Sequence, residues 1–210
     1  MSGQQASNVD SVRPARGLVL ASSSPYRRAL LERLACPFEW QAPEIDESRR
    51  PGESAMDLVR RLALAKARAL AGNYPTALIV GSDQLAVVNG HPLGKPGSAE
   101  RAFEQLSMAS GQRVEFLTSV CVLDCAREHY ELQVVTTNVR FRDLNERQIR
   151  NYIDREHPLD CAGSFKCEGL GIALFESMTS DDPSALIGLP LIALVGMLSR
   201  AGFDILAESP

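Results

Sequence analysis

The chain has 210 residues and a formal net charge of −4, and 45% of its residues are hydrophobic while 23% are charged. This length predicts one compact domain, and the slightly acidic balance gives no basis for non-specific binding to nucleic acid. The first 16 residues are polar and have no apolar targeting core. We therefore expect residues 1–16 to be a disordered lead-in and residues 17–206 to form a single domain.

The longest apolar run, residues 186–198, is too short to span a bilayer and contains Pro190. We therefore expect a cytoplasmic protein without membrane contact. The five cysteines form no CxxC pair and have no spaced histidine pair beside them. This pattern favours reduced, structural thiols over a zinc site or a disulfide framework.

Strand-like and helix-like segments alternate along the chain. In order, the sequence predicts a strand at 17–22, a helix at 24–36, a strand at 38–40, a helix at 54–72, a strand at 76–82, a hairpin at 84–93, a helix at 98–110, strands at 113–124 and 129–141, a helix at 145–156, a Gly-rich stretch at 161–176 and a helix at 188–202. This order favours an α/β fold in which helices flank a mixed β-sheet with a central cleft.

The stretch ASSSPYRR, residues 21–28, brings small hydroxyl residues to the expected N-terminus of a helix. Backbone N–H groups at such a position bind anions, and Arg27 or Arg28 can add a bidentate phosphate contact. An ordinary helix cap with solvated arginines is the alternative.

Acidic residues cluster at Glu44, Asp46 and Glu47, in a segment that resembles a loop. Carboxylates suit a divalent cation that is shared with a nucleotide, but this pattern by itself favours a solvated acidic loop. Lys66 stands beside the apolar stripe of the helix at 54–72. Such a lysine either extends to solvent along the stripe or points into a cleft.

Asp83 is the most informative single residue, because it follows the apolar run at 76–82 and a second apolar run begins after it. A carboxylate at the carboxyl end of a strand is a common functional position in α/β folds, and a turn-forming Asp is the alternative. The nearby GHPLGKP, residues 90–96, is one residue too short for a phosphate loop and has Pro96 in place of the hydroxyl residue. Lys95 remains as a cation, and we expect it at the tip of this hairpin.

Near the end of the chain, CAGSFKCEGLGI combines glycines with Lys166 and Glu168. Loops of this kind often line binding sites. The three histidines form no cluster, and we assign His157 no catalytic role. Together, the cations, carboxylates and small-residue loops suit phosphate-anhydride chemistry with a divalent metal.

These motifs resemble the Maf-like nucleotide pyrophosphatases over residues 17–203. The matching pieces, in order, are LASSSPYRR, IDE, RLALAKA, GSDQ, GKP, CAGSFKCEGLGI and GLPL. The resemblance implies an elongated α/β fold with a mixed sheet and a deep nucleotide-binding cleft, often as a homodimer. It also implies hydrolysis of a nucleoside triphosphate between the α- and β-phosphates with Mg²⁺, Mn²⁺ or Co²⁺.

By the same resemblance, Asp83 corresponds to the proton acceptor that activates water, and Glu47 to a carboxylate that holds the metal or positions the water. Both carboxylates are candidate metal ligands. The residues that correspond to phosphate contacts or to cations that offset phosphate charge are Ser22, Arg27, Lys66, Lys95 and Lys166.

Tyr26, Gln84 and Glu168 occupy the positions associated with base choice, and this set resembles the branch of the family that acts on 7-methyl-GTP. The branch that acts on dTTP and UTP has Arg, Thr and Gln there. N7-methylguanine carries a positive ring charge, which a tyrosine face and a carboxylate both attract. Which of the three residues contacts the base stays open at this point. A dTTP/UTP or broad-range pyrophosphatase and a non-enzymatic nucleotide-sensing protein in cell-division control are the alternatives.

Overall fold

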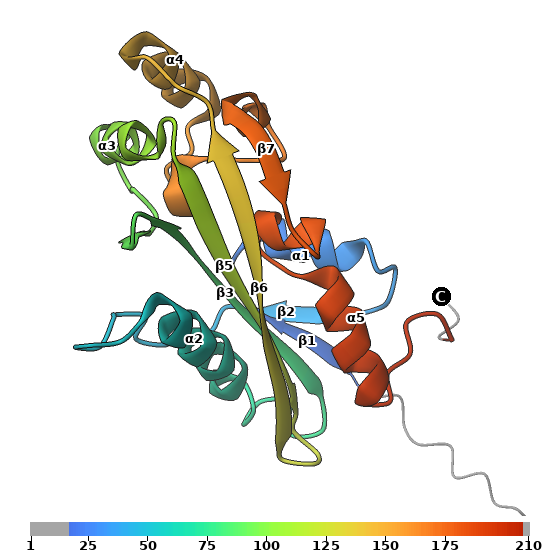
Figure 1. Cartoon of the computed structure of the whole chain (residues 1–210). Coiled ribbons are helices and arrows are strands. Elements are labelled where there is room, and N and C mark those ends of the chain that lie inside the picture. The colour runs from blue at the N-terminus through green and yellow to red at the C-terminus, as the bar shows by residue number, and fades with distance from the viewer. Residues whose placement is uncertain (1–16, 208–210) are drawn as a thin grey trace, which may run out of the picture.

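The structure, a computed structural model, describes residues 17–207 and contains a mixed seven-stranded sheet (Figure 1). The strands are β1 (Leu18–Ala21), β2 (Glu39–Gln41), β3 (Leu78–Val88), β4 (His91–Leu93), β5 (Arg113–Asp124), β6 (His129–Phe141) and β7 (Phe175–Thr179). The α-helices are α1 (Pro25–Glu32), α2 (Ala55–Ala69), α3 (Ala99–Ala109), α4 (Glu146–Glu156) and α5 (Leu191–Arg200). Short 3₁₀ turns are η1 (Ala162–Ser164), η2 (Leu170–Leu174) and η3 (Pro183–Ile187). The α/β class predicted from the sequence is confirmed.

The sheet changes from parallel to antiparallel across its width. Its order is β2-β1-β3-β5-β6-β7, and β4 pairs with β3 outside this path. The strand β1 pairs in parallel with β2 and β3, whereas β3, β5, β6 and β7 pair antiparallel. The long strands β5 and β6 give the molecule its elongated shape (Figure 1).

The strand β3 corrects one expectation from the sequence. The apolar run was predicted to end at residue 82, with Asp83 at the strand end, but β3 continues through Asp83 to Val88. It continues because β5 pairs with it along its whole length, with Ser119 opposite Asp83. The shorter strand β1 stops at Ala21, opposite Gly81, and therefore leaves the space beside Asp83 uncovered.

Local sequence explains where the helices and the hairpin begin and end. The hydroxyls of Ser24, Ser54 and Ser98 each accept a hydrogen bond from the third backbone N–H that follows, as N-caps do. The predicted hairpin turn is present at Asn89 and Gly90, whose φ angles of 49° and 79° are those that such two-residue turns require.

Helices cover both faces of the sheet, and each contributes part of the core. The helix α2 packs on one face over β3 and β5, and α1 and α5 lie on the other face (Figure 1). The helices α3 and α4 pack together at the far end, around Phe116, Phe141 and Phe165. These packed regions leave a gap beside the middle of β3.

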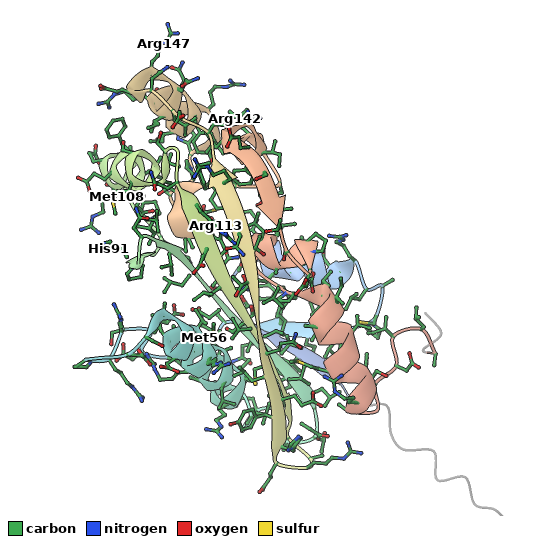
Figure 2. The ribbon with its side chains drawn as sticks, viewed as in Figure 1. Met56, His91, Met108, Arg113, Arg142 and Arg147 are labelled. Carbon is green, nitrogen blue, oxygen red and sulfur yellow. The ribbon has the colours of Figure 1, made fainter. Side chains whose placement is uncertain are left out.

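Other expectations concern single residues. The five cysteines all lie among the described residues, and none of them forms a disulfide. Among residues 17–207, no helix has the length and apolarity needed to cross a bilayer. His91 stands exposed on β4, at the edge of the molecule in Figure 2. The predicted lead-in, residues 1–16, lies outside the described residues.

Candidate active site

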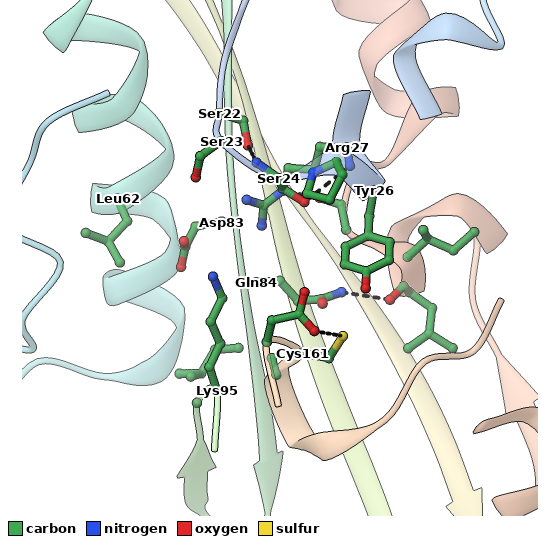
Figure 3. A pocket seen from close by; sticks show the side chains of 18 of the residues that line it. Ser22, Ser23, Ser24, Tyr26, Arg27, Leu62, Asp83, Gln84, Lys95 and Cys161 are labelled. Carbon is green, nitrogen blue, oxygen red and sulfur yellow. Dashed lines mark hydrogen bonds between the residues drawn. The ribbon is translucent and has the colours of Figure 1, made fainter. Parts of the chain in front are cut away.

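A cleft of about 500 Å³ opens beside β3, at the place where β1 stops (Figure 3). Its walls come from the β1–α1 connection, α2, β3, the segment after β4, the Gly-rich stretch and the residues around η3. Every residue to which the family resemblance gives a role lines this cleft except Lys166, whereas the further candidates Arg28, Glu44 and Asp46 do not line it. No histidine of the described residues lines it.

The first wall is the start of α1, where the predicted anion site lies. Pro25 occupies the first turn, and Ser22 accepts a hydrogen bond of 3.1 Å from the backbone N–H of Ser24. The guanidinium of Arg27 donates through Nε to the carbonyl of Gly188 at 2.8 Å. Burial lowers the pKa of Arg27, while the negative charges of Asp83 and Glu47 oppose that shift. The arginine therefore remains a cation held against the cleft wall.

The opposite wall holds a lysine between two carboxylates. The Nζ atom of Lys66 lies 2.7 Å from Asp83 Oδ1 and 3.1 Å from Glu47 Oε1. Lys66 is only 5% exposed, so it does not extend to solvent along α2. Ser119 fixes the backbone beneath Asp83, because its hydroxyl accepts from the Asp83 N–H at 3.2 Å and donates to the Val59 carbonyl at 2.7 Å.

Lys95 enters the cleft from a position that differs from the expected one. It was predicted to stand at the tip of the hairpin, but the tip is Asn89-Gly90 and Lys95 follows β4 on the return. Figure 3 shows its side chain extending into the cleft. The resemblance of residues 90–96 to a phosphate loop has no structural counterpart, since a short strand, β4, occupies residues 91–93.

The side-chain amide of Gln84 is held by hydrogen bonds to β5 and η3. Its Nε2 atom donates to Thr118 Oγ1 at 3.0 Å and to the carbonyls of Ala185 and Leu186 at 2.9 and 3.1 Å. Since these carbonyls belong to η3, Gln84 joins β3 to that turn. Its donors are therefore engaged, and Oε1 remains as the polar atom that the side chain can offer a ligand.

A second group of residues lies at the other end of the cleft. Tyr26 shares this end with Asp160, Cys161, Cys167 and Glu168. Burial raises the pKa of Tyr26, with further contributions from Cys161 and Asp160. Burial, with the charge of Asp160, raises the pKa of Cys161 to about 12. Burial and Glu168 raise that of Cys167 to about 12. Both thiols therefore stay protonated at neutral pH and are poor nucleophiles and metal ligands.

Lys166 is the predicted residue that the structure places elsewhere. Its ammonium donates to the Glu156 carbonyl at 3.2 Å and lies 6.0 Å from the centre of the Tyr26 ring. It is therefore near Tyr26 but does not line the cleft.

The carboxylates Glu47 and Asp83 are the groups that could hold a metal ion. No cluster of three or more His, Cys, Asp or Glu side chains suited to a metal occurs in the described part of the chain. Two carboxylates are enough for Mg²⁺ when phosphate oxygens and water complete its coordination, as is usual for nucleotide-bound metal. The donor set thus fits a metal that arrives with a phosphate ligand.

Three features of the cleft were not predicted from the sequence. Asp160 lines the cleft near Tyr26, and the sequence around it gave no indication of this beyond the motif in which it stands. Thr118 and the carbonyl of Gly188 contact Gln84 and Arg27 across more than 30 residues of sequence separation. Partners at this separation leave no local pattern in a single sequence.

Known proteins match this chain over most of its length. The pattern of the family described as Maf-like protein matches residues 17–201. The chain is 56% identical over 188 residues to the 7-methyl-GTP pyrophosphatase of Pseudomonas aeruginosa, covering 90% of this chain and 98% of that relative. It is 54% identical to the protein of the same name from Chromohalobacter salexigens, covering 89% and 97%.

Among solved structures, the Staphylococcus aureus Ham1 protein is similar at 17% identity and a TM-score of 0.45, covering 61% of this chain and 73% of that one. The family pattern, by contrast, spans nearly all of the described residues. The chain therefore belongs to the Maf-like protein family.

Proposed function

We propose that this protein hydrolyses 7-methyl-GTP to 7-methyl-GMP and pyrophosphate. The observation that carries the proposal is one cleft with two chemically different ends. Lys66 contacts Asp83, the charge of Asp83 acts on Arg27, and Lys95 extends towards the same carboxylate (Figure 3). Tyr26 lies on the other side of the cleft beside Cys161, where the charge of Glu168 contributes to raising the pKa of Tyr26 (Figure 3). The first end suits a triphosphate, and the second suits a flat, positively charged base. Relatives that match over most of the chain are named 7-methyl-GTP pyrophosphatases, which supports this assignment.

In the proposed reaction, the triphosphate lies along the cations, and a water molecule attacks the α-phosphorus. Asp83 accepts the proton of that water as the new O–P bond forms. The bond from the α-phosphorus to the bridging oxygen breaks at the same time, and pyrophosphate leaves with the electron pair. Arg27, Lys66 and Lys95 stabilise the charge that develops on the phosphate oxygens.

Glu47 and Asp83 would hold a divalent metal together with oxygens of the substrate. Such a metal supplies further stabilisation of the leaving pyrophosphate. Without a ligand, the Lys66 ammonium contacts both carboxylates and offsets their mutual repulsion. Comparison of pyrophosphate release with Mg²⁺, Mn²⁺ and Co²⁺ identifies the metal that gives the fastest turnover.

Selection of the base would rest on charge. N7-methylguanine differs from guanine by one methyl group and one positive charge. The carboxylate of Glu168 can accept hydrogen bonds from the guanine N–H groups and attract the ring charge, while the Tyr26 face attracts the cation. Asp160, at the same end of the cleft, adds negative charge. A pocket of this composition favours the methylated base over the neutral one.

The test is pyrophosphate release from 7-methyl-GTP, GTP, UTP and dTTP, with each of the three metals. We expect kcat/KM to be highest for 7-methyl-GTP and turnover to stop when the metal is chelated. Faster turnover of UTP or dTTP would contradict the base assignment and favour the alternative branch of the family. Binding of 7-methyl-GTP without release from any nucleotide would contradict the enzymatic role and favour a nucleotide sensor.

A further inference from the structure

The loop that carries Glu168 is closed on itself. The carbonyl of Lys166 accepts hydrogen bonds from the N–H groups of Gly169 at 3.2 Å and of Gly171 at 3.0 Å. A Cβ atom on Gly171 would collide with the Lys166 backbone, so this turn requires glycine. Glu168 projects from the loop and lines the cleft. The position of Glu168 therefore depends on whatever holds this turn in place.

The last turn of α4 holds it through two side chains and one carbonyl. The hydroxyl of Tyr152, a residue only 3% exposed, accepts from the Lys166 N–H at 3.0 Å. Glu156 Oε2 accepts from the Leu170 N–H at 2.7 Å, and the Glu156 carbonyl accepts from Lys166 Nζ at 3.2 Å. Residues on both sides of Glu168 are thus tied to the same helix end.

The fit between Glu156 and the loop is close. A Cβ atom on Gly169 would lie 2.7 and 2.9 Å from the two carboxylate oxygens of Glu156. The absence of a side chain at Gly169 is therefore what lets the carboxylate reach the Leu170 N–H. Glu156 does not line the cleft itself, so any effect it has on a nucleotide must act through the loop.

The same helix end also sets the position of Asp160, the other acidic residue near Tyr26. The helix α4 ends at His157, which has a left-handed φ of 48° and turns the chain towards Asp160 and Cys161. Both residues line the cleft. The C-terminus of α4 thus borders both segments that face Tyr26, although the helix lies outside the cleft.

We infer that Glu156 is a positioning residue for base recognition: its carboxylate fixes the loop that carries Glu168 by accepting from the Leu170 N–H, while its backbone carbonyl holds Lys166 near Tyr26. The inference rests on the proposed function, since it deepens the account of the same cleft. If it is correct, removing the carboxylate disorders the base end and leaves the phosphate end intact.

Three variants separate these roles. Glu156→Ala removes the acceptor for the Leu170 N–H, Glu156→Gln keeps an oxygen acceptor, and Asp154→Ala is a control at an exposed position on the same helix. For Glu156→Ala we expect KM for 7-methyl-GTP to rise about tenfold, the order expected for one lost hydrogen bond, with a much smaller change in kcat. The preference for 7-methyl-GTP over UTP should fall in parallel. Glu156→Gln should restore most of both, and Asp154→Ala should match the parent protein.

Hydrogen exchange at the Leu170 amide gives a readout that needs no activity. We expect protection in the parent protein and in Glu156→Gln, and faster exchange in Glu156→Ala. Unchanged exchange in Glu156→Ala, or a KM and preference equal to those of Asp154→Ala, would overturn the inference. If the parent protein does not hydrolyse 7-methyl-GTP, the proposed function fails, and amide exchange still decides whether Glu156 fixes the loop.

If the Glu156 variants do not fold, Tyr152→Phe tests the same inference. Tyr152→Phe removes only the oxygen that accepts from the Lys166 N–H and keeps the buried ring. It should shift KM and base preference in the same direction as Glu156→Ala, with its melting temperature recorded alongside. A folded Tyr152→Phe protein with parental KM and preference would argue against control of the loop by α4.

Discussion

The ammonium of Lys66 lies 2.7 Å from a carboxylate oxygen of Asp83, and the two side chains are 7% and 12% exposed. Glu47 contacts the same ammonium at 3.1 Å but is 58% exposed, at the mouth of the cleft. The lysine thus has a buried partner and an accessible one. A triphosphate that enters the cleft offers the ammonium a new anion, which would free the carboxylates for water and metal.

Replacing Asp83 by Asn should nearly abolish turnover while nucleotide binding persists. The amide keeps the shape of the side chain but cannot accept a proton from water, and general-base catalysis typically contributes about 10²–10⁴-fold. The measurement is kcat for 7-methyl-GTP, together with binding of the nucleotide by calorimetry. Asp154→Asn is the matched control, an identical change at an exposed site on α4. Near-parental kcat in Asp83→Asn would remove Asp83 from the role of base.

Replacing Lys66 by Met should destabilise the fold through Asp83. Removing one partner of a buried ion pair leaves the other charge uncompensated and typically costs about 3–5 kcal/mol. The free energy of unfolding in urea should therefore fall by about 3 kcal/mol. In the double variant with Asp83→Asn, the total loss should be smaller than the sum of the two single losses, because the stranded charge is gone.

A surface pair provides the comparison for this measurement. Arg200 and Glu131 lie 2.7 Å apart, with side chains 58% and 33% exposed. Arg200→Met should lower the free energy of unfolding far less than Lys66→Met, because solvent screens the exposed pair. Equal losses in Lys66→Met and Arg200→Met would show that the ion pair in the cleft is not energetically special.

Much of the fold could be predicted from the sequence, because local patterns determine it. The strands expected at 113–124 and 129–141 have the bounds of β5 and β6, and the Ser and Asn caps mark the helix starts. The strand β7 was missed because four of its five residues are exposed, so it has no buried alternation to recognise. Its partner, β6, fixes it by hydrogen bonds that only the tertiary structure reveals.

The candidate site was predicted in composition but not in arrangement. The motifs identified Lys66, Asp83 and Glu47, whereas their contact depends on how α2 packs on β3. Asp83 was placed at a strand end because Asp is rare within strands, and it lies inside β3 because β5 pairs with the whole strand. The position of Lys166 near Tyr26 depends on its hydrogen bond to the end of α4. No local sequence pattern indicates that contact. The catalytic and binding roles of these residues stay predictions.

Replacing Glu168 by Gln should reduce selectivity for the charged base. The amide retains a hydrogen-bond acceptor but carries no negative charge to attract the N7-methylguanine ring. We expect kcat/KM for 7-methyl-GTP to fall more than that for GTP or UTP, and by more than tenfold at low ionic strength. Added salt should narrow the difference between Glu168→Gln and the parent protein, since screening weakens charge attraction at this exposed position. Equal losses on all three nucleotides would assign Glu168 to the phosphates or the metal instead.

The contact between α2 and β3 offers a test of how the fold sets the distance between Lys66 and Asp83. A Cβ atom on Gly81 would collide with the carbonyl of Ala63 and lie 3.0 Å from the backbone nitrogen of Ala67, on either side of Lys66 in α2. Gly81→Ala must therefore push the helix away from the strand. Overpacking of this kind typically costs about 1–3 kcal/mol.

The displaced helix should also carry Lys66 away from Asp83, so kcat should fall together with stability. Gly72→Ala is the matched control, because a Cβ atom at Gly72, just beyond α2, meets nothing within 4 Å. Urea denaturation and kcat for 7-methyl-GTP should both distinguish the two variants. A Gly81→Ala protein with reduced stability but parental kcat would mean that the Lys66–Asp83 distance does not limit turnover, because the strained helix would then have moved without consequence for the chemistry.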